Sequence, residues 1–292
     1  MRLPFPRLAR RSLAAAVPAL LGVLALAPAP AASAATAEYV ALGDSMASGP
    51  LIPDVTGPVA CGRSTHNYAH ELTAKIGAAV FRDVTCSGAD SDDMFNPQQT
   101  SLLGQTSVTV PPQLDALAAT TTLVTLTVGG NDAGLIGVAE DCVKLDPTAA
   151  TCRSEHTSGG VDQVAQRVDA FGPRLAAVLD AVHQRAPQAR VVVTGYGLYI
   201  KAHGCWPVVP VLPSDADWLQ GLVNRLNAVI SAQAAAHGAT YVDLVGPSAG
   251  HDACQSAAKK WIEGYVPVNL AAPLHPNRNG EAAYAQVIAG RL

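Results

Sequence analysis

Short β-prone runs that alternate with amphipathic helical segments constrain the fold of this chain more than any other feature. Strand-like runs occupy residues 39–43, 80–84, 123–128, 191–193 and 240–245, and helical spacing occupies residues 68–79, 161–185, 215–237 and 279–291. Strands that alternate with helices predict a parallel sheet covered on both faces. We therefore expect a three-layer α/β/α sandwich with about five parallel strands, joined by right-handed crossovers in the order 2-1-3-4-5.

Three of these strands end in turns of small or polar residues. Ser45 follows the first strand in Gly43-Asp44-Ser45, Gly88 follows the second, and Asn131 follows the third. Because the carboxyl ends of parallel strands share one edge of a sheet, we expect the three residues to meet in one site. The backbone N–H groups of Ser45 and Gly88 and the side-chain amide of Asn131 are suitable donors for an oxyanion hole.

A serine nucleophile also needs a general base, and the chain contains eight histidines. His275 lies in Leu274-His275-Pro276-Asn277, a stiff loop before the last predicted helix, and we interpret it as the base.

His66 and His70 are four residues apart, a spacing that can hold zinc. No third ligand or nearby Glu completes a metalloprotease pattern in the sequence, so we expect neither a metal site nor a cofactor.

The N-terminus has the pattern of a secretion signal. Four arginines between residues 2 and 11 precede an Ala- and Leu-rich stretch, and Ala32-Ser33-Ala34 is a small-residue cleavage site. The apolar stretch is too short and too interrupted by prolines for a membrane span. We predict a signal peptide at 1–34, with cleavage after residue 34 or 37, and a single domain at 35–292. Arg10-Arg11 leaves twin-arginine export open beside the Sec route.

Charge and cysteine content narrow the class of partner. Without its first 34 residues the chain has 15 basic and 23 acidic residues, a net charge near −8, which argues against nucleic acid or an anionic membrane as a partner.

Six cysteines in an exported chain indicate disulfides, and six allow 15 connectivities. Proximity in sequence favours Cys61–Cys86, Cys142–Cys152 and Cys205–Cys254. The sequence has no Cys-x-x-Cys pair to suggest a metal cluster.

The blocks around Ser45, Gly88, Asn131 and His275 resemble, in this order, those of the SGNH hydrolase family, also called GDSL lipases and esterases. They span nearly the whole predicted mature chain. The cysteine pattern further resembles secreted actinomycete lipases with three sequential disulfides. The resemblance implies an α/β/α sandwich that hydrolyses carboxylic esters through an acyl-enzyme. Ser45 would be the nucleophile and His275 the general base and then acid, with Ser45, Gly88 and Asn131 as the oxyanion hole.

The chain departs from this family at one position. The family usually has an aspartate three residues before the histidine, and this chain has Ala272 there. Some secreted relatives use a backbone carbonyl instead, so we predict that the Ala272 carbonyl accepts a hydrogen bond from His275 Nδ1–H. The expected catalytic unit is a Ser-His dyad, with a neutral dipole in place of the triad acid.

A second serine motif competes with this interpretation. Gly246-Pro247-Ser248-Ala249-Gly250 matches the nucleophile elbow of α/β-hydrolases and follows a predicted strand. Too little chain remains after Ser248 for the acid and histidine of that fold, and Pro247 removes a backbone N–H at the turn. We interpret this segment as an ordinary turn.

The expected function is that of a monomeric, secreted lipase or esterase that acts on small acyl esters or lipids without stable membrane insertion. Phospholipase A1 and polysaccharide O-acetyl esterase activity are alternatives on the same fold, and a non-catalytic secreted binding protein is a third reading. A sugar-binding site needs aromatic platforms, and the chain has only 14 aromatic residues, which favours lipid.

Overall fold

The computed structural model describes Met1, residues 38–101 and residues 107–292. Apart from Met1, the predicted signal peptide at 1–34 and both cleavage positions lie outside these residues. The signal peptide and the start of the domain therefore stay predictions.

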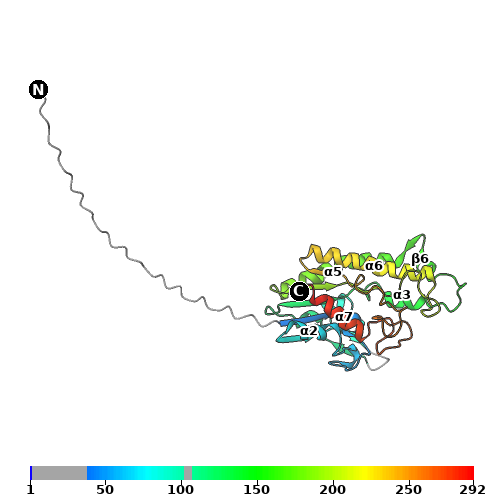
Figure 1. Ribbon diagram of the computed structural model, residues 1–292, viewed down its shortest axis with the longest axis horizontal. Helices are drawn as coiled ribbons and strands as arrows, with labels where there is room; N and C mark the ends of the chain where they lie inside the picture. Colours follow the sequence, from blue (N-terminus) through cyan, green and yellow to red (C-terminus); the bar gives the residue numbers. More distant parts are fainter. Residues whose placement is uncertain (2–37, 102–106) are drawn as a thin grey trace. The chain divides into compact units, whose positions relative to one another are not determined.

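A five-stranded parallel sheet forms the centre of the described chain (Figure 1). Its strand order confirms the predicted topology. The strands run in the order β2-β1-β5-β8-β9, with β1 at Glu38–Gly43, β2 at Val80–Asp83, β5 at Leu123–Thr127, β8 at Arg190–Thr194 and β9 at Thr240–Val242. Gly43 pairs with Thr127, so β1 and β5 end side by side. The segments that follow these two strands are therefore neighbours at the carboxyl edge of the sheet.

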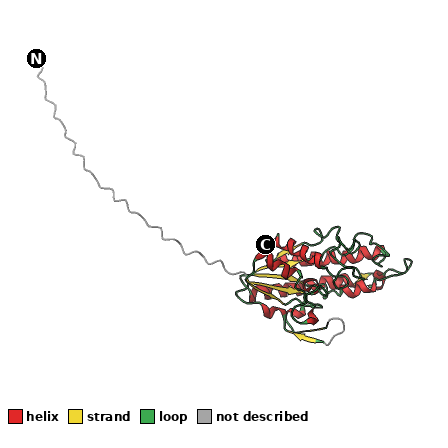
Figure 2. Cartoon of the chain, turned by 60° about the horizontal axis from the view of Figure 1, so that its bottom comes forward, coloured by secondary structure: helices red, strands yellow, loops and turns green. Residues whose placement is uncertain are grey.

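Helices cover the sheet on both faces (Figure 2). The longer helices pack in two pairs: α2 (Tyr68–Ile76) with α7 (Arg278–Ala289), and α5 (Gln163–Arg185) with α6 (Pro213–Ala236). The remaining elements are α1 (Ser45–Ser48), α3 (Leu135–Asp141), α4 (Cys152–Glu155), the 3-10 turns η1 (Val59–Cys61), η2 (Asp92–Met94) and η3 (Gln113–Ala116), and the short strands β3 (Gln98–Thr100), β4 (Val108–Val110), β6 (Thr157–Ser158) and β7 (Val161–Asp162). Not one of the described helices is both long and apolar enough to span a bilayer.

The core is built around the central strand β5, whose five residues are all buried. Two of them are threonines, and each hydroxyl has a tyrosine partner. Tyr39 Oη lies 2.7 Å from Thr125 Oγ1, and Tyr68 Oη lies 2.9 Å from Thr127 Oγ1. These contacts satisfy polar groups that would otherwise destabilise a buried sheet.

Three disulfides link the loops, at the pairs that sequence proximity favours: Cys61–Cys86, Cys142–Cys152 and Cys205–Cys254. Two local features were not resolved from the sequence. Residues 113–116 form only the short 3-10 turn η3, because the backbone is already extended at Leu117, with a ψ of 147°. The antiparallel pair β3–β4 was not predicted, since its three-residue strands are too short to show an alternating pattern.

Candidate active site

Ser45 is the first residue of α1, directly after the sharp turn that ends β1. The turn needs glycine, because Gly43 has a φ of 147° and a Cβ there would lie 2.6 Å from the Thr127 carbonyl oxygen. Asp44 caps α1, and its Oδ1 accepts a hydrogen bond from Met46 N–H at 2.9 Å. Within the described residues the Ser45 N–H has no hydrogen-bond partner and stays available to a ligand.

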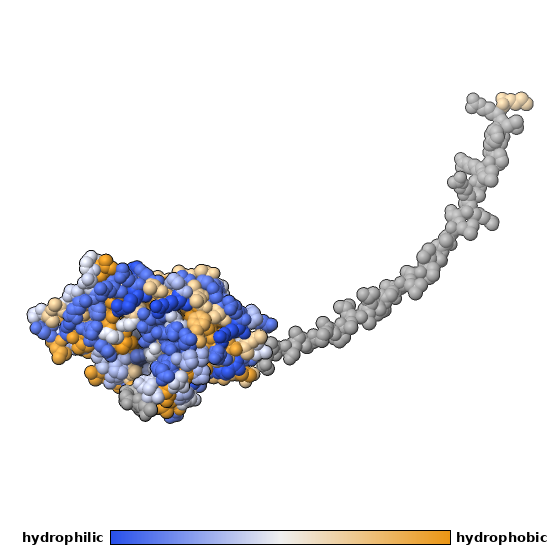
Figure 3. Space-filling model, turned by 180° about the vertical axis from the view of Figure 1, so that it is seen from behind, coloured by the Kyte–Doolittle hydropathy of each residue, from blue (hydrophilic) through white to orange (hydrophobic). Residues whose placement is uncertain are grey.

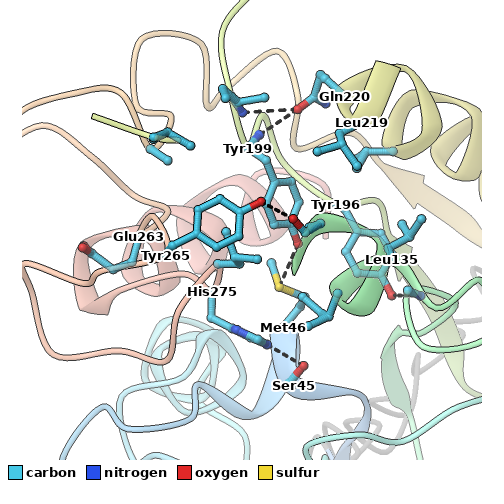
Figure 4. A pocket seen from close by; sticks show the side chains of 18 of the residues that line it. Ser45, Met46, Leu135, Tyr196, Tyr199, Leu219, Gln220, Glu263, Tyr265 and His275 are labelled. Atoms are coloured by element: carbon cyan, nitrogen blue, oxygen red, sulfur yellow. Dashed lines mark hydrogen bonds between the residues drawn. The ribbon is translucent and has the colours of Figure 1, made fainter. Parts of the chain in front are cut away.

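His275 contacts Ser45 directly. Its Nε2 lies 2.7 Å from Ser45 Oγ, although 230 residues separate the two in sequence (Figure 4). Its Nδ1 lies 2.7 Å from the carbonyl oxygen of Pro273, so Nδ1 carries the proton and Nε2 can accept the serine proton.

The Ala272 carbonyl was predicted to accept the hydrogen bond from His275 Nδ1–H, and this prediction is wrong. A backbone carbonyl does orient the imidazole, but it belongs to Pro273. The Ala272 carbonyl instead accepts the backbone N–H of His275 at 3.2 Å. The chain turns at Leu274, whose φ is 62°, and this left-handed turn places the carbonyl of Pro273 against the ring.

Burial sets the protonation state of His275. Only 8% of the residue is exposed, and burial lowers the pKa of its imidazole below 6.5, while the bond to the Pro273 carbonyl partly opposes the shift. The imidazole is therefore neutral at neutral pH. A neutral imidazole with a free Nε2 lone pair is the form that can act as a general base.

The other two predicted oxyanion donors, Gly88 and Asn131, lie in the turns after β2 and β5. Asn131 lines the same cavity as Ser45 and His275, and one N–H of its amide binds the Ala89 carbonyl at 2.8 Å, which leaves the second N–H for a ligand. Gly88 has a φ of 81° and is exposed, and its N–H has no partner among the described residues. Gly88 is not among the residues that line the cavity, so the structure brings Ser45, Asn131 and His275 together more closely than Gly88.

A hydrogen-bonded link that was not predicted from the sequence joins the turns after β1 and β5. Tyr196 Oη donates to Asp44 Oδ2 at 2.5 Å and accepts from Gly130 N–H at 2.8 Å. Burial raises the pKa of Asp44 to about 7, against the lowering effect of the bonds from Tyr196 and Met46 N–H. One signal was visible in the sequence, because Gly195-Tyr196-Gly197 follows the fourth strand at the same edge of the sheet.

An apolar cavity extends from Ser45 (Figure 4), and a mostly apolar lining with a few polar groups is typical of small-molecule sites. Its walls come from α3, α6 and the loops before and after α6. The apolar lining residues include Met46, Leu135, Ile136, Ala139, Tyr199, Ile200, Val209, Val211, Leu219, Val223, Ala253, Tyr265 and Leu274. Gln220 faces the cavity, but its Oε1 accepts the N–H groups of Tyr199 and Ile200. The cavity therefore suits an alkyl chain whose reacting end lies at Ser45.

The competing motifs have structural roles. Ser248 is fully buried, and its hydroxyl donates to the Leu244 carbonyl at 2.6 Å and accepts from Leu198 N–H at 2.7 Å. His66 lies 3.4 Å from Glu71, and His70 Nδ1 lies 3.0 Å from the N-capping side chain of Asn67. Within residues 38–101 and 107–292, no three His, Cys, Asp or Glu side chains converge as a metal site would require.

The parallel sheet and the serine-histidine contact beside an apolar cavity define a class of α/β ester hydrolases. Residues 41–283 match the GDSL-like Lipase/Acylhydrolase family, and the chain belongs to it. Lipase 2 of Streptomyces coelicolor is 35% identical over 96% of this chain and 97% of its own. The protein is accordingly a carboxylic ester hydrolase.

Solved structures show the same similarity. The crystal structure of phospholipase A1 from Streptomyces albidoflavus has a TM-score of 0.72 and 30% identity, over 88% of this chain and 100% of its own. An extracellular lipase from Streptomyces rimosus has a TM-score of 0.70 and 27% identity, over the same shares of the two chains.

Proposed function

We propose that this protein is a secreted lipase or esterase that uses Ser45 and His275 as a catalytic dyad. The observation that carries the proposal is the 2.7 Å contact between Ser45 Oγ and His275 Nε2 at the base of the apolar cavity. Three disulfides and the sequence pattern of a signal peptide support export, as does the similarity to a lipase described as extracellular.

The proposed reaction has two halves. His275 Nε2 takes the Ser45 proton as Oγ attacks the ester carbonyl, and the resulting oxyanion accepts hydrogen bonds from Ser45 N–H, Gly88 N–H and the Asn131 amide. The imidazolium then protonates the alcohol as the ester C–O bond breaks, which leaves an acyl-enzyme. Water attacks the acyl-enzyme with His275 again as base, and the carboxylic acid leaves while Oγ regains its proton.

The Pro273 carbonyl orients His275 in this scheme. A neutral carbonyl stabilises an imidazolium less than a carboxylate does, so the dyad relies on fixed geometry and on the oxyanion donors. Asp243, an acid that could assist from a distance, instead accepts the N–H groups of Val245 and Gly246 at 3.0 Å each. We expect both Asp243→Asn and Ala272→Asp to change kcat by less than about threefold, since Nδ1–H already has its acceptor.

A serine-directed phosphonate tests the nucleophile. It should add one phosphonyl group to Ser45, detected by peptide mass spectrometry, and Ser45→Ala should lose both the adduct and the hydrolysis of p-nitrophenyl esters. Ser248→Ala is the matched control, because its hydroxyl lies outside the cavity and labelling of Ser45 should persist. An unlabelled Ser45 in folded protein would support the non-catalytic binding protein instead.

Phospholipase A1 activity is the second candidate, and the similarity to the S. albidoflavus enzyme favours it. The apolar walls give no support to a polysaccharide substrate. A phosphatidylcholine with different acyl chains at its two glycerol positions separates the possibilities. Release of only the sn-1 fatty acid would indicate phospholipase A1, whereas hydrolysis restricted to p-nitrophenyl esters or triacylglycerol would indicate an esterase or a lipase.

A further inference from the structure

The most exposed large apolar side chains of the described residues gather in three loops. Apolar side chains are scattered over the face seen in Figure 3, as on any soluble protein. Apart from Met1, only five of the large ones in the described chain are at least 60% exposed: Leu145 (82%), Val208 (72%), Val266 (82%), Val268 (60%) and Leu270 (69%). We call these five residues the apolar rim.

The three loops that carry the rim contact one another. Trp206 Nε1 donates to the Lys144 carbonyl at 3.0 Å, and Lys144 N–H donates to the Pro210 carbonyl at 2.7 Å. A Cβ on Gly264 would lie 3.7 Å from a methyl group of Val209, which joins the third loop to the second. The three loops that carry the rim are therefore neighbours, and Val268 and Leu270 also line a second hollow next to the third loop.

The same loops form the wall of the cavity. Val209 and Tyr265, each next to a rim residue in sequence, line it. Tyr265 Oη also donates to the carbonyl of Ala139 in α3, which lines the cavity as well, at 2.5 Å. The rim thus borders the cavity that leads to Ser45.

A buried carboxylate holds the third loop in place. Glu263 Oε2 accepts Val268 N–H at 2.8 Å, and Glu263 Oε1 accepts the side-chain amides of Asn269 and Asn277 at 2.8 and 2.7 Å. Burial raises the pKa of Glu263, but these hydrogen bonds outweigh it and hold the pKa below its usual value. The ionised Glu263 fixes the loop between Tyr265 and Ala271, so its apolar side chains are presented on a defined backbone.

The five rim side chains carry no charge, and the Asp54 and Arg278 side chains that line a hollow with Val268 and Leu270 are of opposite sign. The ionisable neighbours of Leu145 are already engaged: Lys144 pairs with Glu155 at 2.9 Å, and Asp146 accepts the N–H and the hydroxyl of Thr148. The sequence after residue 34 has a net charge near −8, which repels an anionic surface. An uncharged apolar patch on an acidic protein complements a surface that is itself apolar and has no net charge.

We propose that the apolar rim docks onto the surface of aggregated zwitterionic lipid and places the mouth of the cavity against it. The proposal rests on the proposed function, because it names the physical state of the substrate that this site meets. A second copy of the chain is a poorer occupant, since five side chains are far fewer than the roughly 20–30 residues that each partner contributes to a stable interface. Partial burial of exposed Leu and Val in a lipid surface is favourable by the hydrophobic effect.

Vesicle binding tests the proposal independently of catalysis. The probe is a large unilamellar vesicle of diether phosphatidylcholine, which has no carboxylic ester, and bound protein is measured by sedimentation. The rim variant L145E/V266E changes the two most exposed rim residues. The control V80E/L292E places the same two Glu side chains outside the rim. Val80 is 41% exposed at the start of β2, and Leu292 is 37% exposed at the last residue of the sequence.

We expect the wild type and V80E/L292E to bind equally, and L145E/V266E to bind at least tenfold more weakly. All three should hydrolyse a water-soluble short-chain p-nitrophenyl ester at similar rates, which shows that the variants are folded. V208E/L270E repeats the test with different rim residues. An inactive wild type that still binds vesicles would refute the dyad and leave the docking surface standing.

Three results would overturn the proposal. The wild type could fail to bind, or the rim and control variants could bind equally. Binding could require added phosphatidylglycerol and disappear at high salt, which would indicate an electrostatic surface. Analytical ultracentrifugation could show a dimer that only the rim variants abolish, without vesicle binding, which would make the rim a contact between copies.

Discussion

Replacing Tyr196 with Phe tests whether one buried hydroxyl aligns the turn that carries Ser45 with the turn that carries Asn131. The change removes a 2.5 Å hydrogen bond to Asp44 and leaves Gly130 N–H without its 2.8 Å partner. A hydrogen bond to an ionisable group contributes about 1.5–3 kcal/mol, and an unpaired buried donor costs about 1–3 kcal/mol. Because the two effects share one hydroxyl and are not additive, we expect Tyr196→Phe to lower the free energy of unfolding by about 3 kcal/mol.

Tyr199→Phe is the matched control for this substitution. Tyr199 also lines the cavity, but its hydroxyl donates only to the sulfur of Met46, a weak acceptor, at 3.0 Å. We expect Tyr199→Phe to cost less than about 1 kcal/mol. Urea unfolding at pH 7, followed by tryptophan fluorescence and circular dichroism, measures both values.

The catalytic consequence of Tyr196→Phe follows from the position of Gly130. This residue directly precedes Asn131, so a loosened Gly130 turn displaces the proposed oxyanion donor, whose hydrogen bond matters more in the transition state than in the bound substrate. We expect kcat for a p-nitrophenyl ester to fall at least tenfold, equivalent to about 1.4 kcal/mol, with KM nearly unchanged. Rates are normalised to the fraction of Ser45 that a phosphonate titrates. Equal losses of stability and of kcat in Tyr196→Phe and Tyr199→Phe would refute the reasoning.

Three further predictions follow from titration and from the disulfides. Because burial lowers the pKa of His275, kcat/KM should fall on acidification with an apparent pKa below 6.5, and a limb above 6.5 would contradict a buried neutral base. Folding raises the pKa of Asp44 from 3.8 to about 7. The wild type should therefore lose stability relative to Asp44→Asn as the pH rises from 3.8 to about 7, by up to about 1.4 kcal/mol per pH unit. An equal dependence of unfolding free energy on pH in both proteins would contradict this pKa shift. Replacing Cys205 and Cys254 by Ser removes the disulfide that joins residues 49 positions apart and should lower the free energy of unfolding by about 4 kcal/mol. A phosphonate should still label Ser45 in the folded variant.

The fold could be predicted from the sequence because each of its elements has a local signal. The run at 123–128 is β-prone throughout because β5 is buried on both faces, and the amphipathic segment at 161–185 became α5 with its start shifted to Gln163. Asp162 explains the shift, since its side chain caps the helix by accepting the N–H groups of Val164 and Ala165. Hairpin β3–β4 lacked such a signal because its pairing depends on only three residues in each strand.

Much of the candidate site was also predictable, because Ser45, Asn131 and His275 each lie in a short motif at an expected strand end. The acceptor of the His275 Nδ1–H hydrogen bond was not predictable, because the choice between the carbonyls of Ala272 and Pro273 depends on the backbone angles of Leu274. Tyr196 was missed for a different reason. Its role exists only through contacts with Asp44 and Gly130, which are 152 and 66 residues away in sequence.

These contacts explain how the proposed dyad, which lacks a carboxylate, can keep its geometry. Tyr196 joins the turns after β1 and β5, and Asn131 joins the latter to the turn after β2 through the Ala89 carbonyl. His275 is held from the other side, where Glu263 N–H donates to the His275 carbonyl at 2.9 Å. Since the Glu263 carboxylate also anchors the loop that carries Val268, the proposed base and the apolar rim share one supporting residue. A lipid surface that pressed on the rim would therefore act on the residue whose backbone N–H holds the carbonyl of His275.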